Sequence, residues 1–337
     1  MQLTLLYLNQ KIKMTFKDLK NYYNKVLVFY SPERAGYWNS ITPCAIFEKP
    51  NKLGRYYLDF RSKIFYPGTF SKDGIPLFSH QGKDLIIHPT VVIQYAFGIY
   101  DNLYQGNFGD AELKGKFLKM AKWLETSSVD VKGGKGWFIN IEYNPEYKLD
   151  NSWISAITQG QAISVLTRAS LLDITRNYEQ LAEDALGPLK FEVKDGGLIN
   201  FFNSIPVFEE CPTPHKPMVV LNGFIFALFG LYDLILLNGS ETAKQLFAQG
   251  IDSLNKILPF FDINNWTQYY LFDYPHKYYS SFTYHILVTE QLKALYYLTG
   301  DINFLKYHEK WNGYSKSYIN RTRALIKKVT SSNKFGI

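Results

Sequence analysis

The spacing of hydrophobic residues along the chain changes near residue 85. Before that point, aromatic and β-branched residues alternate with turn signals, as in residues 26–30 and 55–60. Alternation of this kind predicts strands joined by tight turns. The Asp73-Gly74 pair is typical of a hairpin turn, with residues 75–78 starting the return strand. We therefore expect a β-rich N-terminal portion with strands and hairpins over residues 1–85.

From Pro89 onward, apolar residues recur at steps of three and four, which predicts amphipathic helices. Proline suits the first turn of a helix, so the first of these helices is expected to begin at Pro89. Residues 133–136 interrupt the helical pattern, and residues 137–141 and 143–145 are predicted to form an irregular or β segment. Further helices are predicted over residues 110–125, 153–177, 178–187, 218–237, 243–258, 279–299 and 304–328.

The predicted helices come in pairs joined by loops that carry Gly, Pro and Asp. Residues 298–301 read Leu-Thr-Gly-Asp, a helix stop followed by a new helix start. No self-similarity at a fixed period is evident, which disfavours a regular solenoid. We expect a mainly α fold in which an α/α-toroid (α/α-barrel) of paired helices, residues 86–337, follows the β-rich N-terminal portion.

Composition narrows the class of partner. Apolar residues make up 46% and charged residues 20% of the 337, which excludes a disordered or fibrous protein. A formal charge of +7 favours an anionic partner, which could be nucleic acid, an anionic membrane surface or an acidic polysaccharide. No dense basic block or nucleic-acid motif is present, so nucleic acid is the weakest of the three. The 26 tyrosines suit a glycan-binding cleft, although they equally suit an aromatic core.

Cys44 and Cys211 give neither a disulfide framework nor a metal-ligand spacing, and we expect no metal and no cofactor. No segment stands out as a membrane span. The apolar N-terminus lacks a basic leader and soon reaches Lys11 and Lys13, so it is a poor secretory signal. The expected location is therefore the cytoplasm.

Four sequence blocks carry a family resemblance. They are W-I-S-A-I-T-Q-G-Q-A-I-S at 153–164 with Arg168-Ala169; E-E-C-P at 209–212 with V-L-N-G-F at 220–224 and G-L-Y-D-L at 230–234; W-T-Q-Y at 266–269 with Tyr284-His285 and Gln291-Leu292; and His88-Pro89 with Gln94-Tyr95. Together they resemble the C-terminal catalytic domain of the D-glucuronyl C-5 epimerases, over about residues 55–325. The resemblance implies a β-rich portion packed on an α/α-barrel, often in a homodimer, that converts D-glucuronate to L-iduronate in heparosan-like polysaccharides.

Inverting the carboxyl-bearing carbon requires a base on one face, an acid on the other and groups that neutralise the enediolate. The resemblance implies Glu210 for one face, Tyr284 for the other, and Tyr269 as a third catalytic group that donates to the carboxylate. A tyrosine with an ordinary pKa near 10 needs a neighbour that tunes or relays its proton. His285 is adjacent in sequence, but adjacent residues on a helix point about 100° apart.

Further residues are candidates for substrate binding. Trp153 could be a stacking platform or a core anchor, and only one of Gln159 and Gln161 can face the substrate because they are two apart on a helix. Arg168 would be either a carboxylate clamp or a buried ion pair. The remaining candidates for the cleft wall are Cys211, His285, Arg61 and His88.

The chain departs from the family pattern at three places. Cys211 stands where the family has tyrosine, and Phe272 stands near a basic position, so that carboxylate recognition could pass to His276 or Lys277. Residues 287–289 read Leu-Val-Thr where the family often has His-Ile. These departures leave open a polysaccharide lyase or uronyl hydrolase, a catalytically silent glycan-binding protein, or a helical scaffold.

Overall fold

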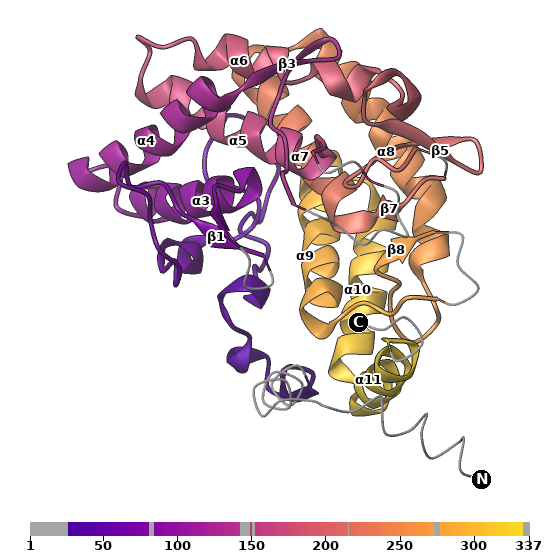
Figure 1. Cartoon of the computed structure of the whole chain (residues 1–337). Coiled ribbons are helices and arrows are strands. Elements are labelled where there is room, and N and C mark those ends of the chain that lie inside the picture. The colour runs from indigo at the N-terminus through magenta and orange to yellow at the C-terminus, as the bar shows by residue number, and fades with distance from the viewer. Residues whose placement is uncertain are drawn as a thin grey trace, which may run out of the picture.

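The computed structural model describes residues 26–80, 84–141, 149, 152–214, 216–272 and 277–332, and it is mainly helical (Figure 1). Lys11 and Lys13 near the N-terminus, residues 143–145 and His276 lie outside this range. The α-helices are α3 (Pro89–Gln105), α4 (Ala111–Ser127), α5 (Ala156–Leu172), α6 (Tyr178–Asp184), α7 (Leu221–Asn238), α8 (Glu241–Phe261), α9 (Phe282–Thr299), α10 (Ile302–Lys316) and α11 (Tyr318–Ser332).

Short elements connect the helices. The 3-10 helices are η1 (Pro32–Arg34), η2 (Tyr37–Asn39), η3 (Arg61–Ile64), η5 (Gly187–Lys190) and η6 (Val193–Asp195). The strands form four antiparallel pairs: β1 (Phe78–Ser79) with β2 (Leu85–Ile86), β3 (Val129–Val131) with β4 (Gly134–Gly136), β5 (Ile199–Phe202) with β6 (Ile205–Phe208), and β7 (Val219–Val220) with β8 (Tyr270–Leu271).

The predicted helices are confirmed in kind, with shifted ends. The helix predicted to begin at Pro89 does so. Gly300, at φ +76°, ends α9, and the side chain of Asp301 accepts from the amide of Asn303 to begin α10. The prediction of a single helix over residues 304–328 is wrong: the segment forms two helices, α10 and α11, separated at Ser317.

The expectation of a β-rich N-terminal portion is not met in residues 26–80. Residues 26–28 are helical, and Phe29 packs edge-on against Phe282 of α9 with ring centroids 6.1 Å apart. Aromatic side chains here therefore pack against helices instead of forming a pleated surface. Strand-like pairing is confined to single bridges and β1; one bridge, Phe70 to Pro76, closes the predicted turn at Gly74.

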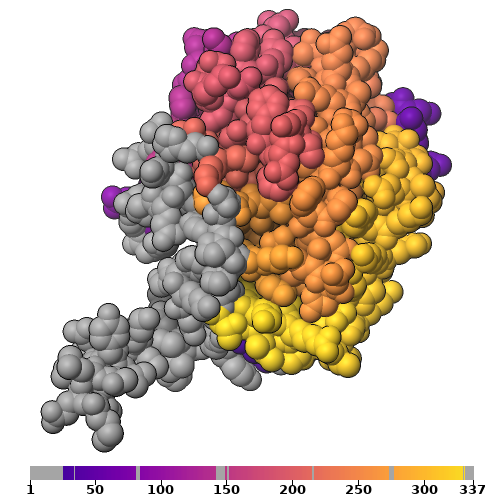
Figure 2. All heavy atoms as spheres, turned by 90° about the vertical axis from the view of Figure 1, so that its right-hand side faces the viewer, coloured from indigo at the N-terminus to yellow at the C-terminus, as the bar shows by residue number. Residues whose placement is uncertain are grey.

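The helices divide into buried and half-exposed ones. Residues 156–169 of α5 and 221–234 of α7 are buried on all sides, which explains why neither shows one clear apolar face. Helices α4 and α8 bury only one stripe each. Figure 1 shows α9 and α10 side by side, and the first described residues contact α11. In Figure 2 the orange segment that includes α8 lies between the red segment near residues 190–215 and the yellow C-terminal helices.

Helix α7 corrects the expectation that no segment could span a membrane. Among the described residues it is the one helix long and apolar enough to do so by length and composition. Most of it is buried inside the protein, as in the core helix of a globular domain.

The backbones of α5 and α7 meet at two glycines. A Cβ on Gly230 would lie 2.3 Å from the carbonyl oxygen of Gly160, and a Cβ on Gly160 would lie 2.4 Å from that of Phe226. Side chains at either position would force the helices apart. Both glycines belong to the sequence blocks noted above, and here their role is packing.

A buried ion pair joins the same two helices farther along. The guanidinium of Arg168 donates to both carboxylate oxygens of Asp233, at 2.6 and 3.1 Å, and the hydroxyl of Tyr57 donates to Asp233 at 2.6 Å. The side chains of Arg168 and Asp233 are 1% and 0% exposed. Removing one member of such a pair leaves the other charge buried and unpaired.

We predict that Arg168→Met lowers the free energy of unfolding by about 3–5 kcal/mol, measured by urea denaturation. The control is Arg61→Met, which breaks a surface pair with Asp59 and should cost less than about 1 kcal/mol. Equal effects of the two substitutions would contradict the assignment.

Candidate active site

A cavity of about 230 Å³ opens where α3, α5, α7 and α9 begin. Each helix contributes side chains from its first two turns: Thr90 and Gln94 from α3, Ile157 from α5, Asn222 and Phe226 from α7, and Thr283, Tyr284 and Leu287 from α9. The N-terminal end of a helix carries a partial positive charge. Four such ends at one cavity favour a negatively charged ligand.

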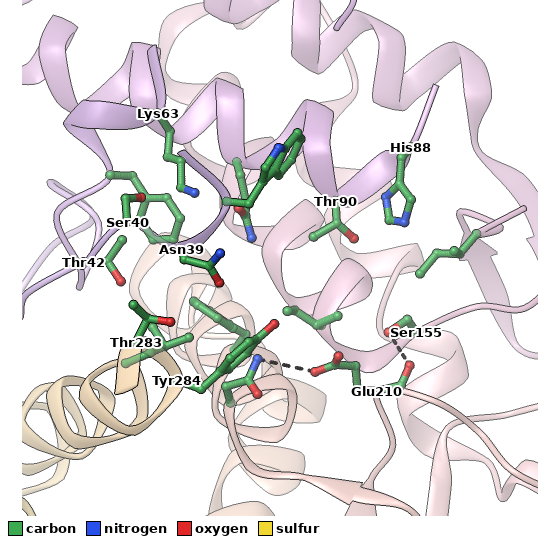
Figure 3. A pocket seen from close by; sticks show the side chains of 18 of the residues that line it. Asn39, Ser40, Thr42, Lys63, His88, Thr90, Ser155, Glu210, Thr283 and Tyr284 are labelled. Atoms are coloured by element: carbon green, nitrogen blue, oxygen red, sulfur yellow. Dashed lines mark hydrogen bonds between the residues drawn. The ribbon is translucent and has the colours of Figure 1, made fainter. Parts of the chain in front are cut away.

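The remaining walls come from loops and short elements. They are formed by Trp38, Asn39, Ser40, Thr42, Phe60, Lys63, His88, Ile139, Ile141, Trp153, Ser155, Glu210 and Cys211. Figure 3 shows Glu210 and Tyr284 entering the cavity from one side and Lys63 and Asn39 from another. The cavity therefore holds acidic, basic and phenolic groups together.

The start of α5 fixes the loop that carries Glu210. The hydroxyl of Ser155 donates to the carbonyl oxygen of Glu210 at 2.5 Å, and the amide of Ala156 donates to that of Glu209 at 3.0 Å. Ser155 stands at the N-cap of α5 but makes no side-chain cap there, since its hydroxyl is used on the loop. Ser155 of the W-I-S-A block thus helps to position Glu210, which lies 55 residues later in the sequence.

The two adjacent glutamates have different surroundings. Glu209 is fully buried and accepts from the amides of Thr213 and Met218 and from the side chain of Asn200. These bonds tie down the loop that follows. Burial raises the pKa of Glu209 to about 8, while the three donors oppose the rise. Glu209 is therefore a structural anchor.

Glu210 turns the other way, into the cavity. Gly223 makes room for it, because a Cβ there would lie 2.3 Å from a carboxylate oxygen of Glu210. The side-chain amide of Asn222 donates to the same oxygen at 3.5 Å, a long bond. Burial raises the pKa of Glu210 to about 7, which allows the carboxyl to take up and release a proton near neutral pH.

Tyr284 stands in the first turn of α9, which the hydroxyl of Ser281 caps by accepting from the amide of Tyr284. The ring of Tyr269 meets that of Tyr284 edge-on, with centroids 4.7 Å apart. Burial, and then the charge of Glu210, raise the pKa of Tyr284 to about 12, while a hydrogen bond with Tyr269 opposes the rise. Tyr284 is therefore a neutral phenol at pH 7, able to donate a proton.

Two predicted substrate-binding residues lie away from the cavity, in the interior. The side-chain amide of Gln159 donates to the carbonyl oxygens of Lys135 and Ala185, each at 2.9 Å. Arg168 is the buried partner of Asp233, so the ion-pair alternative is the correct one. Gln159 therefore ties α5 to β4 and to the end of α6, and Arg168 ties α5 to α7.

The structure also contradicts the substrate-binding roles predicted for His285 and Arg61. His285 is fully buried, stacks on Trp266 with centroids 3.8 Å apart, and bonds Thr267 and the carbonyl oxygen of Trp311. Burial lowers the pKa of His285 to about 3, so it is no proton relay to Tyr284. Arg61 binds Asp59 and Gln105 at the surface and does not line the cavity.

Other predictions place residues in or near the cavity. Trp153, Cys211 and His88 line it, and burial lowers the pKa of His88 to about 4. Gln161 does not line it; its buried side chain has no hydrogen-bond partner among the described residues. Phe272 packs with Cys211 in a small apolar cluster.

Sequence reasoning missed the wall formed by Asn39, Ser40, Thr42 and Lys63. The motif R-S-K-I around Lys63 forms a 3-10 helix, for which neither periodicity nor family blocks give a signal. Lys277, considered for carboxylate recognition, is exposed and does not line the cavity. Within the described residues, no three His, Cys, Asp or Glu side chains are grouped so as to hold a metal ion.

Comparison with known proteins agrees with the motif blocks. Residues 132–313 match the family described as D-glucuronyl C5-epimerase C-terminus. The D-glucuronyl C5-epimerase of Caenorhabditis elegans is 36% identical over 168 residues, which is 45% of this chain and 27% of that protein. An uncharacterized protein of Methanocaldococcus jannaschii is 31% identical over 194 residues, 56% of this chain and 61% of the relative. The chain thus spans less than two thirds of either relative.

We predict that Gly223→Ala destabilises the protein by about 1–3 kcal/mol, because the added methyl group collides with the Glu210 side chain. The control is Gly115→Ala in α4, where a Cβ meets nothing within 4 Å. That substitution should stabilise by about 0.5–1 kcal/mol. Thermal or urea unfolding measures both, and a Gly223→Ala protein as stable as the parent would refute the steric account.

Proposed function

Because this chain belongs to the D-glucuronyl C5-epimerase C-terminus family, we propose that it inverts the carboxyl-bearing carbon of D-glucuronate to L-iduronate in a heparosan-like polysaccharide. The observation that carries the proposal is the pairing of Glu210 and Tyr284 in one cavity, with pKa values raised to about 7 and about 12. Groups with such separated pKa values suit a base and an acid.

In the proposed reaction, the Glu210 carboxylate takes the proton from C5 of the uronate. The electron pair left on carbon passes into the carboxylate, forming an enediolate. The Tyr284 phenol then donates its proton to the other face of C5, and the electron pair returns from the enediolate to form the new C–H bond. The positive ends of four helices lower the energy of the dianion.

The charge of Glu210 couples the two transfers. As long as Glu210 is ionised, its charge raises the pKa of Tyr284 and keeps the phenol protonated. Once Glu210 has taken the substrate proton, this repulsion disappears, and loss of the phenol proton becomes easier. Tyr269, bonded to Tyr284, stabilises the phenolate that forms. Exchange with water then restores both groups.

We further propose that the paired helices form the α/α-toroid expected from the sequence. Buried α5 and α7 have half-exposed α4 and α8 as sequence neighbours, and the cavity lies at one end of the inner helices. This arrangement supports an end-on site open to a chain. Trp153 in the cavity wall offers a ring for stacking on a sugar. A homodimer remains part of this proposal.

The proposal is tested by proton NMR of heparosan incubated with the protein in heavy water. Loss of the H5 signal of glucuronate, together with new iduronate signals, is expected. An unsaturated product absorbing in the ultraviolet would instead identify a lyase. Binding of heparosan without any exchange would identify a glycan-binding protein.

We predict that Glu210→Gln and Tyr284→Phe each lower kcat by about 10²–10⁴-fold, since each removes a proton-transfer group while keeping its shape. The control is Tyr297→Phe, in the last turn of the same helix, which should leave kcat unchanged. Near-wild-type kcat in either site variant would exclude that residue from proton transfer.

The pH dependence follows from the raised pKa of Glu210. The base is active only when ionised, so kcat/KM should rise with pH through about 7. Tyr284 stays protonated up to about pH 12, so no fall from this group is expected below that pH. A profile that is flat between about pH 5 and about pH 7, or that falls with rising pH over that range, would contradict the assignment.

A further inference from the structure

We propose that Lys63 binds the carboxylate of the uronate and stabilises the enediolate, an inference that rests on the proposed function. The reaction places a second negative charge on the carboxylate carbon and its oxygens, so a cation at that position lowers the barrier. Among the described residues that line the cavity, Lys63 is the one Lys or Arg.

A close contact between α3 and η3 positions Lys63 in the cavity wall. Gly98 of α3 lies against η3, where a Cβ would meet the backbone nitrogen of Ile64 at 2.4 Å and the carbonyl carbon of Lys63 at 2.6 Å. The contact brings the backbone of η3 directly onto α3. The Lys63 side chain is consequently held between α3 and the segment that carries Tyr37.

Lys63 is buried without a compensating negative charge. The residue is 3% exposed, and no described carboxylate lies within 4 Å of its ammonium group. The ammonium donates to the carbonyl oxygen of Tyr37 and lies 4.5 Å from the centroid of the Tyr37 ring. An ammonium has three donors, so this one carbonyl leaves capacity for a carboxylate.

In the free protein this environment disfavours the charged form of Lys63. Burial lowers the pKa of Lys63 to about 8, which means that the charged form is disfavoured relative to water. A bound carboxylate would reverse the shift, because an opposite charge favours the ammonium. The enediolate, with its second charge, would favour it further, so the interaction is stronger in the transition state than with bound substrate.

The placement of charges orients the sugar. Figure 3 shows Lys63 and Asn39 on one side of the cavity and Glu210 and Tyr284 on another. The ionised Glu210 repels a carboxylate, and His88, with its pKa lowered to about 4, is neutral at pH 7. A uronate would therefore direct its carboxylate toward Lys63 and present C5 to Glu210 and Tyr284.

The experiment compares binding of heparosan with binding of carboxyl-reduced heparosan, whose carboxylates are replaced by hydroxymethyl groups, by titration calorimetry at pH 7. The wild-type protein should prefer the carboxylated polymer by about 10-fold or more. Lys63→Met should lose that preference, and Lys63→Arg should retain part of it. The control is Lys306→Met, an exposed lysine of α10, which should keep it in full.

Thermal unfolding separates this role from a purely structural one. Methionine removes a buried, uncompensated charge, so Lys63→Met should melt at the wild-type temperature or above it. A lower melting temperature combined with an unchanged preference would show a structural lysine and overturn the inference, as would equal affinity of the wild-type protein for both polymers. A Lys63-dependent preference without C5 exchange would support the carboxylate site and refute the epimerase reaction.

Discussion

The close approach of α5 and α7 is the contact on which the rest of the structure depends. Gly160 and Gly230 let the two backbones touch, and the Arg168–Asp233 pair ties the helices farther along. At the cavity end, α5 anchors the Glu210 loop through Ser155, and α7 leaves room for its carboxyl at Gly223. The helix pair thus positions Glu210: α5 holds its backbone, and α7 contacts its carboxyl group.

Adjacent glutamates show how one loop supplies both rigidity and reactivity. The carboxylate oxygens of Glu209 accept hydrogen bonds from two backbone amides and from Asn200, and these bonds fix the loop. Glu210 receives one long bond, from Asn222, and burial keeps its pKa near neutrality. Glu209 has the higher pKa of the two, but hydrogen bonds already occupy both of its oxygens, whereas Glu210 lines the cavity, where its carboxylate can accept a proton.

Periodicity predicted the helices, and family resemblance pointed to Glu210 and Tyr284, which the structure places at one cavity and whose catalytic roles are a proposal. The substrate-binding roles considered for Gln159 and His285 are not met, and of the two alternatives for Arg168 the buried ion pair is the one observed, because the sequence blocks contain packing residues as well as residues that face the cavity. Their burial and partners decide the matter, and only three-dimensional structure supplies these. Lys63 could not be found from sequence, since its position depends on a contact between η3 and Gly98, 35 residues away. The strands expected near residues 26–30 failed because their aromatic rings pack on helices.

Deuterium at C5, followed at low conversion in heavy water, tests the claim that two groups act on opposite faces. The account predicts that newly formed iduronate carries solvent deuterium, while unreacted glucuronate still carries its original proton. This follows because Tyr284 supplies a proton from the solvent pool and Glu210 removes the original one. Iduronate that retains the original proton at C5 would show a single group carrying the proton across, and would contradict the account.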